Sequence, residues 1–343
     1  RLQIPILFSG LGHVNSYALL DSKGAAIVDA GMPGKATWVA LTGRLKAAGI
    51  KVRDIHTVIV THSHPDHFGS AGQLAHAAGA ELVTERRFRT WMSPRPERGA
   101  ASQPHAHGDA CDEIIGGAAA AQEGDGYEQP DFFSMGTTSP WGGSPMPNMG
   151  RIRWMRRLSR LHLVPYVKPP VPTRLVIGGD HLNLAKRDWQ AVHTPGHTGD
   201  HLCLYDPEEQ LLLSGDHVLP TITPHVPGLS PLSDPLGSYM ASLEKLPLLG
   251  QVRLVLPAHG HPFEDLGGRI DQILEHHHGR LTELEGLIAA GPLSVVDLSH
   301  ELFREPRWGM MAESETYAHL EYLRIRQRAE RLDLNGQVAY RAP

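Results

Sequence analysis

The chain has 343 residues, of which 41% are hydrophobic and 20% are charged, a balance typical of a soluble globular protein. Its net charge of -5 does not supply the basic field that favours binding to nucleic acid or an anionic membrane. No apolar run approaches the roughly 20 residues of a membrane-spanning helix, so no membrane association is expected. Two cysteines, Cys111 and Cys203, do not make a disulfide framework, and a reducing, cytoplasmic location is the simplest expectation. Composition leaves open whether the chain forms a homo-oligomer or has lost a leader.

The first part of the chain alternates between strand and helix patterns. Residues 16–30 hold two apolar runs around a polar turn and predict a β-hairpin. Residues 35–49 carry apolar side chains at helical spacing and predict a helix that stops at a glycine. A strand at 55–60, a helix near 69–78 and a strand at 81–84 follow. This alternation predicts an α/β fold built of packed layers.

Residues 86–175 have a different composition, with proline and glycine throughout. We interpret this region as a partly helical insertion. Its basic segment at 151–160 is most simply a solvated helix face, and the sharper interpretation is a contact with a phosphate or an acyl carrier. Trp141 and Trp154 are expected to be core residues rather than substrate contacts.

Regular structure resumes at residue 174 with short apolar runs that each end in a polar or glycine-rich loop, as buried strands do. From residue 268 the pattern becomes helical. We therefore predict a first domain at 1–266, which includes the insertion, and a helical C-terminal extension at 267–343.

The C-terminal extension shows three further signals. Ser294, with Asp297 three residues later, is predicted to be the N-cap of one helix. Another helix is expected over residues 311–332. The dipeptide Asn335-Gly336 then predicts a turn within a small terminal hairpin. Helices followed by a hairpin predict a winged-helix-like tail.

Histidine and aspartate side chains gather at the ends of four apolar runs. The sequence "THSHPDH" follows the strand at 55–60, and later runs end in "TPGH", "SGD" and "PAH". The side chains concerned are His62, His64, Asp66, His67, His197, Asp216 and His259. Because ligands of α/β sheets bind at the carboxyl ends of the strands, we expect these side chains to meet there.

Their spacing suits two metal ions side by side. His62 and His64 are two residues apart and point the same way on an extended segment, whereas the adjacent Asp66 and His67 cannot. The seven side chains provide about three protein ligands per ion, one shared carboxylate and an open position for water. A lone histidine after a strand is usually solvated or caps a turn, but four such clusters favour a metal site.

The motifs "THSHPDH", "TPGHT", "SGDH" and "PAHG", in this order, resemble the metallo-beta-lactamase superfamily, in its glyoxalase II-like branch. The resemblance covers about residues 1–85 and 174–266. It implies an αββα sandwich with the metals at one edge. The region after "PAHGHPF" resembles the winged-helix-like extension of the lactamase-beta-2-like group.

The same resemblance implies a role for each ligand-type residue. The first ion would be bound by His62, His64 and His197. The second would be bound by Asp66, His67 and His259, and Asp216 would bridge the two. Asp66 would also act in catalysis by orienting the attacking hydroxide. Asp29, in "VDAG", matches a position that supports the site from behind the ligands.

Two residues depart from particular relatives. His64 stands where redox di-iron relatives have a carboxylate, which favours hydrolysis over oxygen chemistry. Asp200 stands where glyoxalase II has a glycine, which argues against specificity for a glutathione thioester.

The predicted function is hydrolysis of a small-molecule acyl compound (a thioester, ester, lactone or lactam) by a metal-bound hydroxide. Two Zn(II) ions are expected, with Mn or Fe as alternatives because such ligands accept all three. One alternative is a phosphodiesterase acting on RNA or a small molecule. Another is a nucleic-acid-binding or regulatory protein with structural metals, although nucleic acid is not the expected partner. The insertion at 86–175 is predicted to cap the metal edge and set substrate choice.

Other histidines are weaker candidates. His217, directly after Asp216, is predicted either to line the pocket or to support it. His105, His107 and Asp109 imitate the main motif, but no apolar run precedes them, so a polar loop is the simpler interpretation. The run at 276–278 lies in a helical segment, where surface positions are expected.

Overall fold

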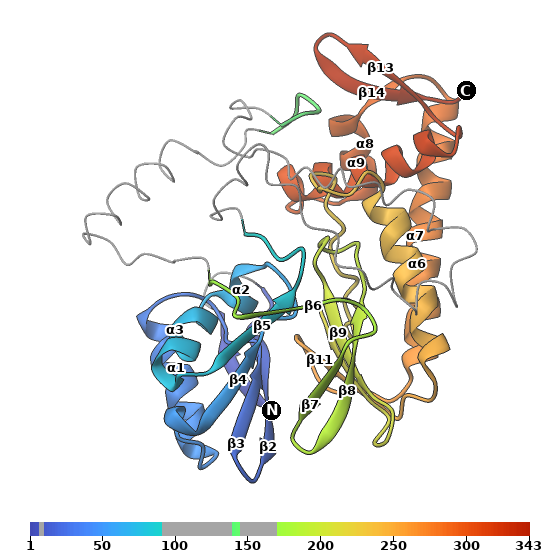
Figure 1. The fold of residues 1–343 in the computed structure, drawn as a ribbon. Helices are drawn as coiled ribbons and strands as arrows, with labels where there is room; N and C mark the ends of the chain where they lie inside the picture. Colours follow the sequence, from blue (N-terminus) through green and yellow to red (C-terminus); the bar gives the residue numbers. More distant parts are fainter. Residues whose placement is uncertain (7–9, 91–138, 145–169) are drawn as a thin grey trace, which may run out of the picture.

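The computed structural model describes residues 1–6, 10–90, 139–144 and 170–343. Two β-sheets face each other, with helices on the outer side of each sheet (Figure 1). This is the αββα sandwich that the sequence motifs predicted. No helix within the described ranges is both long enough and apolar enough to cross a membrane.

The first sheet has six strands in the order β1-β2-β3-β4-β5-β6. Its first three strands are antiparallel, and β3 to β6 run parallel. The strands are β1 (Leu2–Pro5), β2 (His13–Asp21), β3 (Gly24–Val28), β4 (Ile55–Ile59), β5 (Glu81–Glu85) and β6 (Arg174–Val176). The hairpin predicted at 16–30 is confirmed by β2 and β3.

Three helices accompany the first sheet: α1 (Lys35–Ala47), α2 (Pro65–Phe68) and α3 (Ala71–Ala78). Helix α1 buries Leu41 and Leu45 against the sheet, as its periodicity predicted. The short helix α2 begins with a proline, which tolerates the first helical turn because its missing N–H needs no partner there. Helix α2 carries Asp66 and His67, so the cluster of ligand-type residues begins directly at the end of the parallel strands.

The second sheet has five strands in the order β11-β10-β9-β8-β7, and only β10 and β11 are parallel. The strands are β7 (His181–Leu184), β8 (Arg187–His193), β9 (Leu202–Asp206), β10 (Leu211–Gly215) and β11 (Leu254–Pro257). The inner faces of the two sheets meet in one core, in which Ile59 of β4 packs with Trp189 of β8 and Leu213 of β10.

Helices α6 (Pro235–Lys245) and α7 (Leu266–Ala289) lie on the outer side of the second sheet (Figure 1). Helix α6 starts at Asp234, whose side chain accepts a hydrogen bond from the backbone N–H of Gly237 at 2.8 Å, a regular N-cap. The sequence patterns did not predict α6. The core of this layer continues into the C-terminal region, since Leu212 of β10 belongs to the same buried cluster as Leu320 and Tyr340.

The C-terminal region contains β12 (Leu293–Ser294), α8 (Val295–Leu302), α9 (Met310–Ile325), β13 (Glu330–Leu334) and β14 (Gln337–Arg341). Its strands form a small sheet in the order β12-β14-β13. The Ser294 cap is confirmed, because its Oγ accepts from the N–H of Asp297 at 3.1 Å. The helix predicted over 311–332 ends earlier, at Ile325. The chain turns through the left-handed backbone of Gln327 and then pairs as a strand. The winged-helix-like description, and the domain boundary at 266, stay predictions.

One short piece of the insertion, residues 139–144, is anchored in the C-terminal region. The indole N–H of Trp141 donates to Glu313 on α9 at 2.7 Å, and the carbonyl of Trp141 accepts from the N–H of Val338 at 3.1 Å. Trp141 is fully buried, which confirms its predicted place in a core. Trp154 and the basic segment at 151–160 lie outside the described residues.

Candidate metal centre

All seven predicted ligand-type side chains meet at one edge of the sandwich. They lie in the segments that follow β4, β8, β10 and β11, which come from both sheets. Their ligand atoms fall into two groups, within each of which all atoms lie less than 4.8 Å apart. We call His62, His64 and His197 the first ligand group, and Asp66, His67 and His259 the second. Asp216 lies within the first group and also contacts the second.

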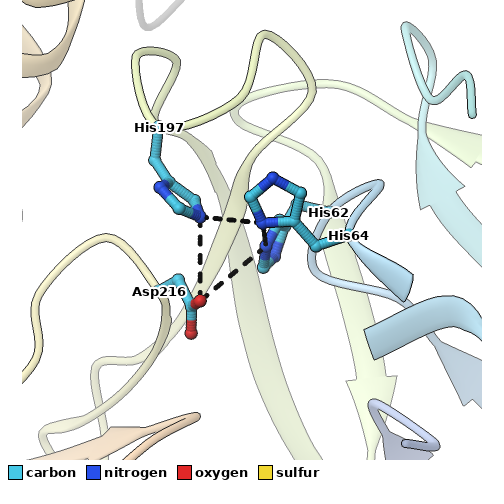
Figure 2. A group of neighbouring side chains, drawn as sticks. All are labelled: His62, His64, His197 and Asp216. Carbon is cyan, nitrogen blue, oxygen red and sulfur yellow. Dashed lines mark hydrogen bonds and ion pairs between the residues drawn. The ribbon is translucent and has the colours of Figure 1, made fainter. Parts of the chain in front are cut away.

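In the first ligand group, three ring nitrogens converge (Figure 2). His64 Nδ1 lies 3.0 Å from both His62 Nε2 and His197 Nε2. Asp216 Oδ2 lies 3.7 Å from His197 Nε2 and 4.0 Å from His62 Nε2. A tetrahedral zinc ion with Zn–N bonds of about 2.0–2.1 Å separates its nitrogens by about 3.3 Å, so this spacing is close to that of a ligand set.

In the second ligand group, imidazoles alternate with carboxylates. Asp66 Oδ2 lies 3.6 Å from His67 Nε2 and 3.4 Å from His259 Nε2. Asp216 reaches the same two rings, with Oδ2 3.5 Å from His67 Nε2 and Oδ1 3.4 Å from His259 Nε2. Asp216 therefore touches histidines of both groups, as a bridging carboxylate would.

Several of these atoms are buried without a hydrogen-bond partner among the described residues, in a way that suits a metal ion. His67 Nε2, His259 Nε2 and Asp216 Oδ1 have no hydrogen-bond partner among the described residues. Buried polar atoms are nearly always satisfied, so a group of unsatisfied imidazole nitrogens and carboxylate oxygens needs an explanation. Such donors are the ones that zinc and similar ions take. The residues present fit a metal.

The opposite ring nitrogens of three histidines are held by hydrogen bonds. His197 Nδ1 donates to the carbonyl of His225 at 2.7 Å, and His259 Nδ1 donates to the carbonyl of His13 at 2.8 Å. His67 Nδ1 lies 2.8 Å from Asp29 Oδ2. These contacts orient each ring so that Nε2 faces the cluster, the arrangement that outer residues provide around bound metals.

Asp29 is itself fixed by several contacts. It follows β3 with a left-handed φ of 57°, a conformation that aspartate tolerates better than most residues. Its carboxylate accepts from the backbone N–H of Thr61 at 2.9 Å and from the Thr61 hydroxyl at 2.9 Å. The structure thus places Asp29 behind His67, in contact with the segment that carries the ligands.

The two ligand groups differ in their charge. Burial lowers the pKa of His62, His64 and His197, and it lowers that of His64 to about 3. Burial opposes charge on His67 and His259 as well, but the carboxylates of Asp216 and Asp66 outweigh it. The pKa of His67 is raised well above its usual value, and that of His259 is raised to about 10. Without a metal, the histidines of the first group are neutral, and His67 and His259 of the second group are protonated.

His201 supports the bridging carboxylate, and the sequence patterns did not single it out. Its Nε2 accepts from the backbone N–H of Asp216 at 3.1 Å, and its Nδ1 lies 2.7 Å from the hydroxyl of Thr194. The ring is fully buried and lies next to that of His62. The only sequence signal for this role was its position as the next histidine after "TPGH".

The backbone around His197 is braced by α6. Gly196 has a φ of 141° and lies so close to Tyr239 that a Cβ there would be 2.4 Å from the Tyr239 Cα. Ser242 Oγ donates to the carbonyl of Pro195 at 2.9 Å. The glycine of "TPGH" therefore permits both the turn and the close approach of the helix.

The remaining candidates lie around the cluster or apart from it. The Asp200 carboxylate accepts from Ser63 Oγ at 3.0 Å, and burial raises its pKa to about 6. His217 is fully buried and packs between His201 and Tyr239, so it does not lie on an exposed pocket wall, and its role stays a prediction. His277 is buried beside His319 in the C-terminal region, away from the metal cluster, whereas His276 and His278 are exposed as expected. His105, His107 and Asp109 lie outside the described residues.

Comparison with known proteins agrees with this geometry. The family model of the metallo-beta-lactamase superfamily matches residues 9–259. A metallo-beta-lactamase family protein from Thermus thermophilus is 27% identical, with a TM-score of 0.72 over 100% of this chain and 97% of that chain. A beta-lactamase domain protein from Burkholderia ambifaria is also 27% identical, with a TM-score of 0.70 over 99% of this chain and 91% of that chain.

Curated relatives match only in part. The lactamase-like protein nscB of Arthroderma benhamiae is 41% identical over 91 residues, which are 26% of this chain and 19% of that protein. The lactamase-like protein aptB of Emericella nidulans is 31% identical over 121 residues, 35% of this chain and 37% of that protein. The chain thus spans well under half the length of these relatives. The family match and the fold agree, however, and the chain belongs to the metallo-beta-lactamase superfamily of generally hydrolytic, metal-dependent enzymes.

Proposed function

We propose that the protein hydrolyses a small acyl compound (a thioester, ester, lactone or lactam) and that it uses two Zn(II) ions, with Mn or Fe as alternatives. The observation that carries this proposal is the convergence of seven ligand-type side chains whose inward-facing atoms include buried, unsatisfied nitrogens and an oxygen. In this assignment the first ligand group would hold one ion, the second would hold the other, and Asp216 would contribute a carboxylate to both. When bound, the metals would supply a Lewis acid and an activated water.

Asp66 is the side chain best placed to orient a water. Burial would raise the pKa of Asp66, but His67 and His259 lower it to about 2, so the carboxylate is ionised and accepts hydrogen bonds. Its side chain is 18% exposed, twice the 9% of Asp216. Because Asp66 is the more accessible of the two carboxylates, it can both serve as a metal ligand and contact a water molecule.

A protein nucleophile is not needed. Cys203 is fully buried, and burial raises the pKa of its thiol to about 12, so it stays protonated and inaccessible.

The composition of the ligand segments themselves favours one substrate class. The ligand segments "THSHPDHFGS", "TPGHTGDH", "SGDHVLPTITPH" and "PAHGHPF" contain no lysine or arginine. An enzyme acting on a nucleic acid needs cations that neutralise several phosphates. A carbonyl substrate has no such requirement, and therefore we favour an acyl substrate over a phosphodiester. The glyoxalase II-like and lactamase-beta-2-like branches remain the proposed placement within the superfamily.

The test compares two reactions on one zinc-loaded preparation whose metal content has been measured. We expect kcat/KM for an acyl thioester to exceed that for an aryl phosphodiester, and to change little between low and moderate salt. Removing the metals with a chelator should abolish turnover, and adding zinc back should restore it. Faster phosphodiester turnover that collapses with added salt would instead favour the phosphodiesterase alternative.

A further inference from the structure

The orientation of His197 depends on a loop outside the ligand motifs. His197 Nδ1 donates to the backbone carbonyl of His225 at 2.7 Å, which leaves Nε2 facing His64 at 3.0 Å. His225 lies between β10 and α6, in a stretch that forms neither helix nor strand. A loop without regular secondary structure can hold a carbonyl in position only if contacts with other elements hold the loop itself.

The loop is fixed by helix α9 of the C-terminal region. The side chain of His225 pairs with Glu315, with Nδ1 3.1 Å from Oε2. Three residues along, the N–H of Gly228 donates to Ser314 Oγ at 3.0 Å. Val226, between these two contacts, is fully buried in the core that the C-terminal helices share with the second sheet. The loop is therefore attached to α9 by a side-chain pair and a hydrogen bond from its backbone, and its Val226 lies in the shared core.

Glu315 is in turn held in place within α9. Its backbone carbonyl accepts from His319 Nδ1 at 2.7 Å, and the other ring nitrogen of His319 lies 3.0 Å from His277 of α7. His319 and His277 are fully buried. The carboxylate that meets His225 thus projects from a packed helix pair.

We propose that Glu315 is a positioning residue for the metal centre: through His225 it fixes the carbonyl that orients His197 toward the first ion. The proposal rests on the ligand roles assigned above. It makes the C-terminal region part of the metal site, although none of the seven ligand-type residues lies beyond residue 259. Outer contacts of this kind are typically worth 10–100-fold in metal affinity, and a contact acting through a carbonyl belongs at the lower end.

The test measures Co(II) binding to the full chain by absorbance, in competition with a chelator. Glu315→Ala should weaken binding of the first ion about tenfold, whereas Glu315→Gln, which retains an acceptor for His225, should recover most of the affinity. The matched control is Glu321→Ala, because Glu321 lies on the same helix but bonds Arg324 and Tyr340. The control should bind both ions as the unaltered protein does.

A second variant separates positioning from general stability. His225→Ala removes the side chain that Glu315 holds and keeps the carbonyl that accepts from His197. This variant should weaken binding of the first ion by a similar factor. The double variant should be no weaker than either single one, because both remove the same link. Because His225 lies in a loop, the His225→Ala variant can test the positioning role even if Glu315→Ala does not fold.

The outcomes are distinguishable. If the unaltered chain takes up no Co(II), the ligand assignment itself is wrong. If it takes up two ions, but Glu315→Ala and His225→Ala bind them as tightly as Glu321→Ala, only the positioning role is overturned. Additive losses in the double variant would also overturn it.

Discussion

The two ligand groups have similar donors but different supports. The second group is held within the first sheet, since Asp29 at the end of β3 orients His67 and the carbonyl of His13 in β2 orients His259. In the first group, His62 is also held at the first sheet, through the Thr61 hydroxyl 3.0 Å from its Nδ1. His197 of that group relies on a loop, because it is oriented by His225, which in turn rests on α9. The second group is therefore built into the sandwich, and the first depends in part on the C-terminal region.

The groups also differ in what a metal has to displace. The first group is neutral without a metal, and the second carries protons on His67 and His259. Metal ligands must be deprotonated, so a metal ion competes strongly with protons only at the second group. Equal ligand counts therefore need not give equal affinities, and four experiments test the difference between the two groups.

The largest effect is expected at Asp216, which contacts both groups. Asp216→Ala should lower kcat/KM by at least about 100-fold and reduce the metal content of both positions, because outer contacts alone are worth up to about 100-fold. Activity assays and metal analysis on the same sample check this. Asp206→Ala is the control, since Asp206 is also a buried aspartate but lies at the opposite end of the same sheet. Full metal content in Asp216→Ala would remove the bridging role.

The second prediction concerns pH. In the metal-free protein the pKa of His259 is raised to about 10, so below this pH a metal must displace its proton. As the pH is lowered, metal affinity at the second group should therefore fall about tenfold per pH unit for each proton displaced, as linkage requires. The first group should change little over the same range, since the pKa of His64 is about 3. Equilibrium dialysis from pH 8 to pH 6 should show one ion lost first, and simultaneous loss of both would contradict this.

The third prediction weakens the second group more than the first, because Asp29 contacts His67 directly and His62 only through the Thr61 hydroxyl. Asp29→Asn keeps a residue that tolerates the left-handed backbone at φ 57° but removes the charge beside His67. We expect affinity for the second ion to fall 10–100-fold while the first ion is retained. This is the mirror image of the pattern expected for Glu315→Ala. A loss of the first ion in Asp29→Asn would show that the two halves are not separately supported.

The smallest effect is expected where the loop meets α9. A Cβ on Gly228 would lie 2.5 Å from the carbonyl oxygen of Ser314, so Gly228→Ala should force the loop away. We expect a loss of about 1–3 kcal/mol in the free energy of unfolding, typical of overpacking. Gly286→Ala is the control: Gly286 lies within α7 with open space around it, and alanine there should stabilise by about 0.5–1 kcal/mol. Thermal denaturation should show these opposite signs.

The sequence was informative wherever a function requires a particular side chain at a particular strand end. Ligand-type residues such as His62, Asp216 and His259 were found in this way, and so was the sandwich that brings them together. His225 and Glu315 were not found, because the group that touches His197 is a backbone carbonyl, which any residue provides. Helix α6 was also missed, since its start at Asp234 follows a proline-rich loop with no clear periodicity. The local sequence pattern carries little information about contacts between segments that are far apart in the chain.

The anchored piece of the insertion has a consequence for how the chain tolerates changes in length. Trp141 ties residues 139–144, which lie within the insertion at 86–175, to α9 and β14. Residues 139–144 are thus a fixed point within the insertion, because Trp141 lies in the core that the C-terminal helices share with the second sheet. A deletion that includes this point removes a buried indole from that core. Such a loss typically costs about 3–5 kcal/mol.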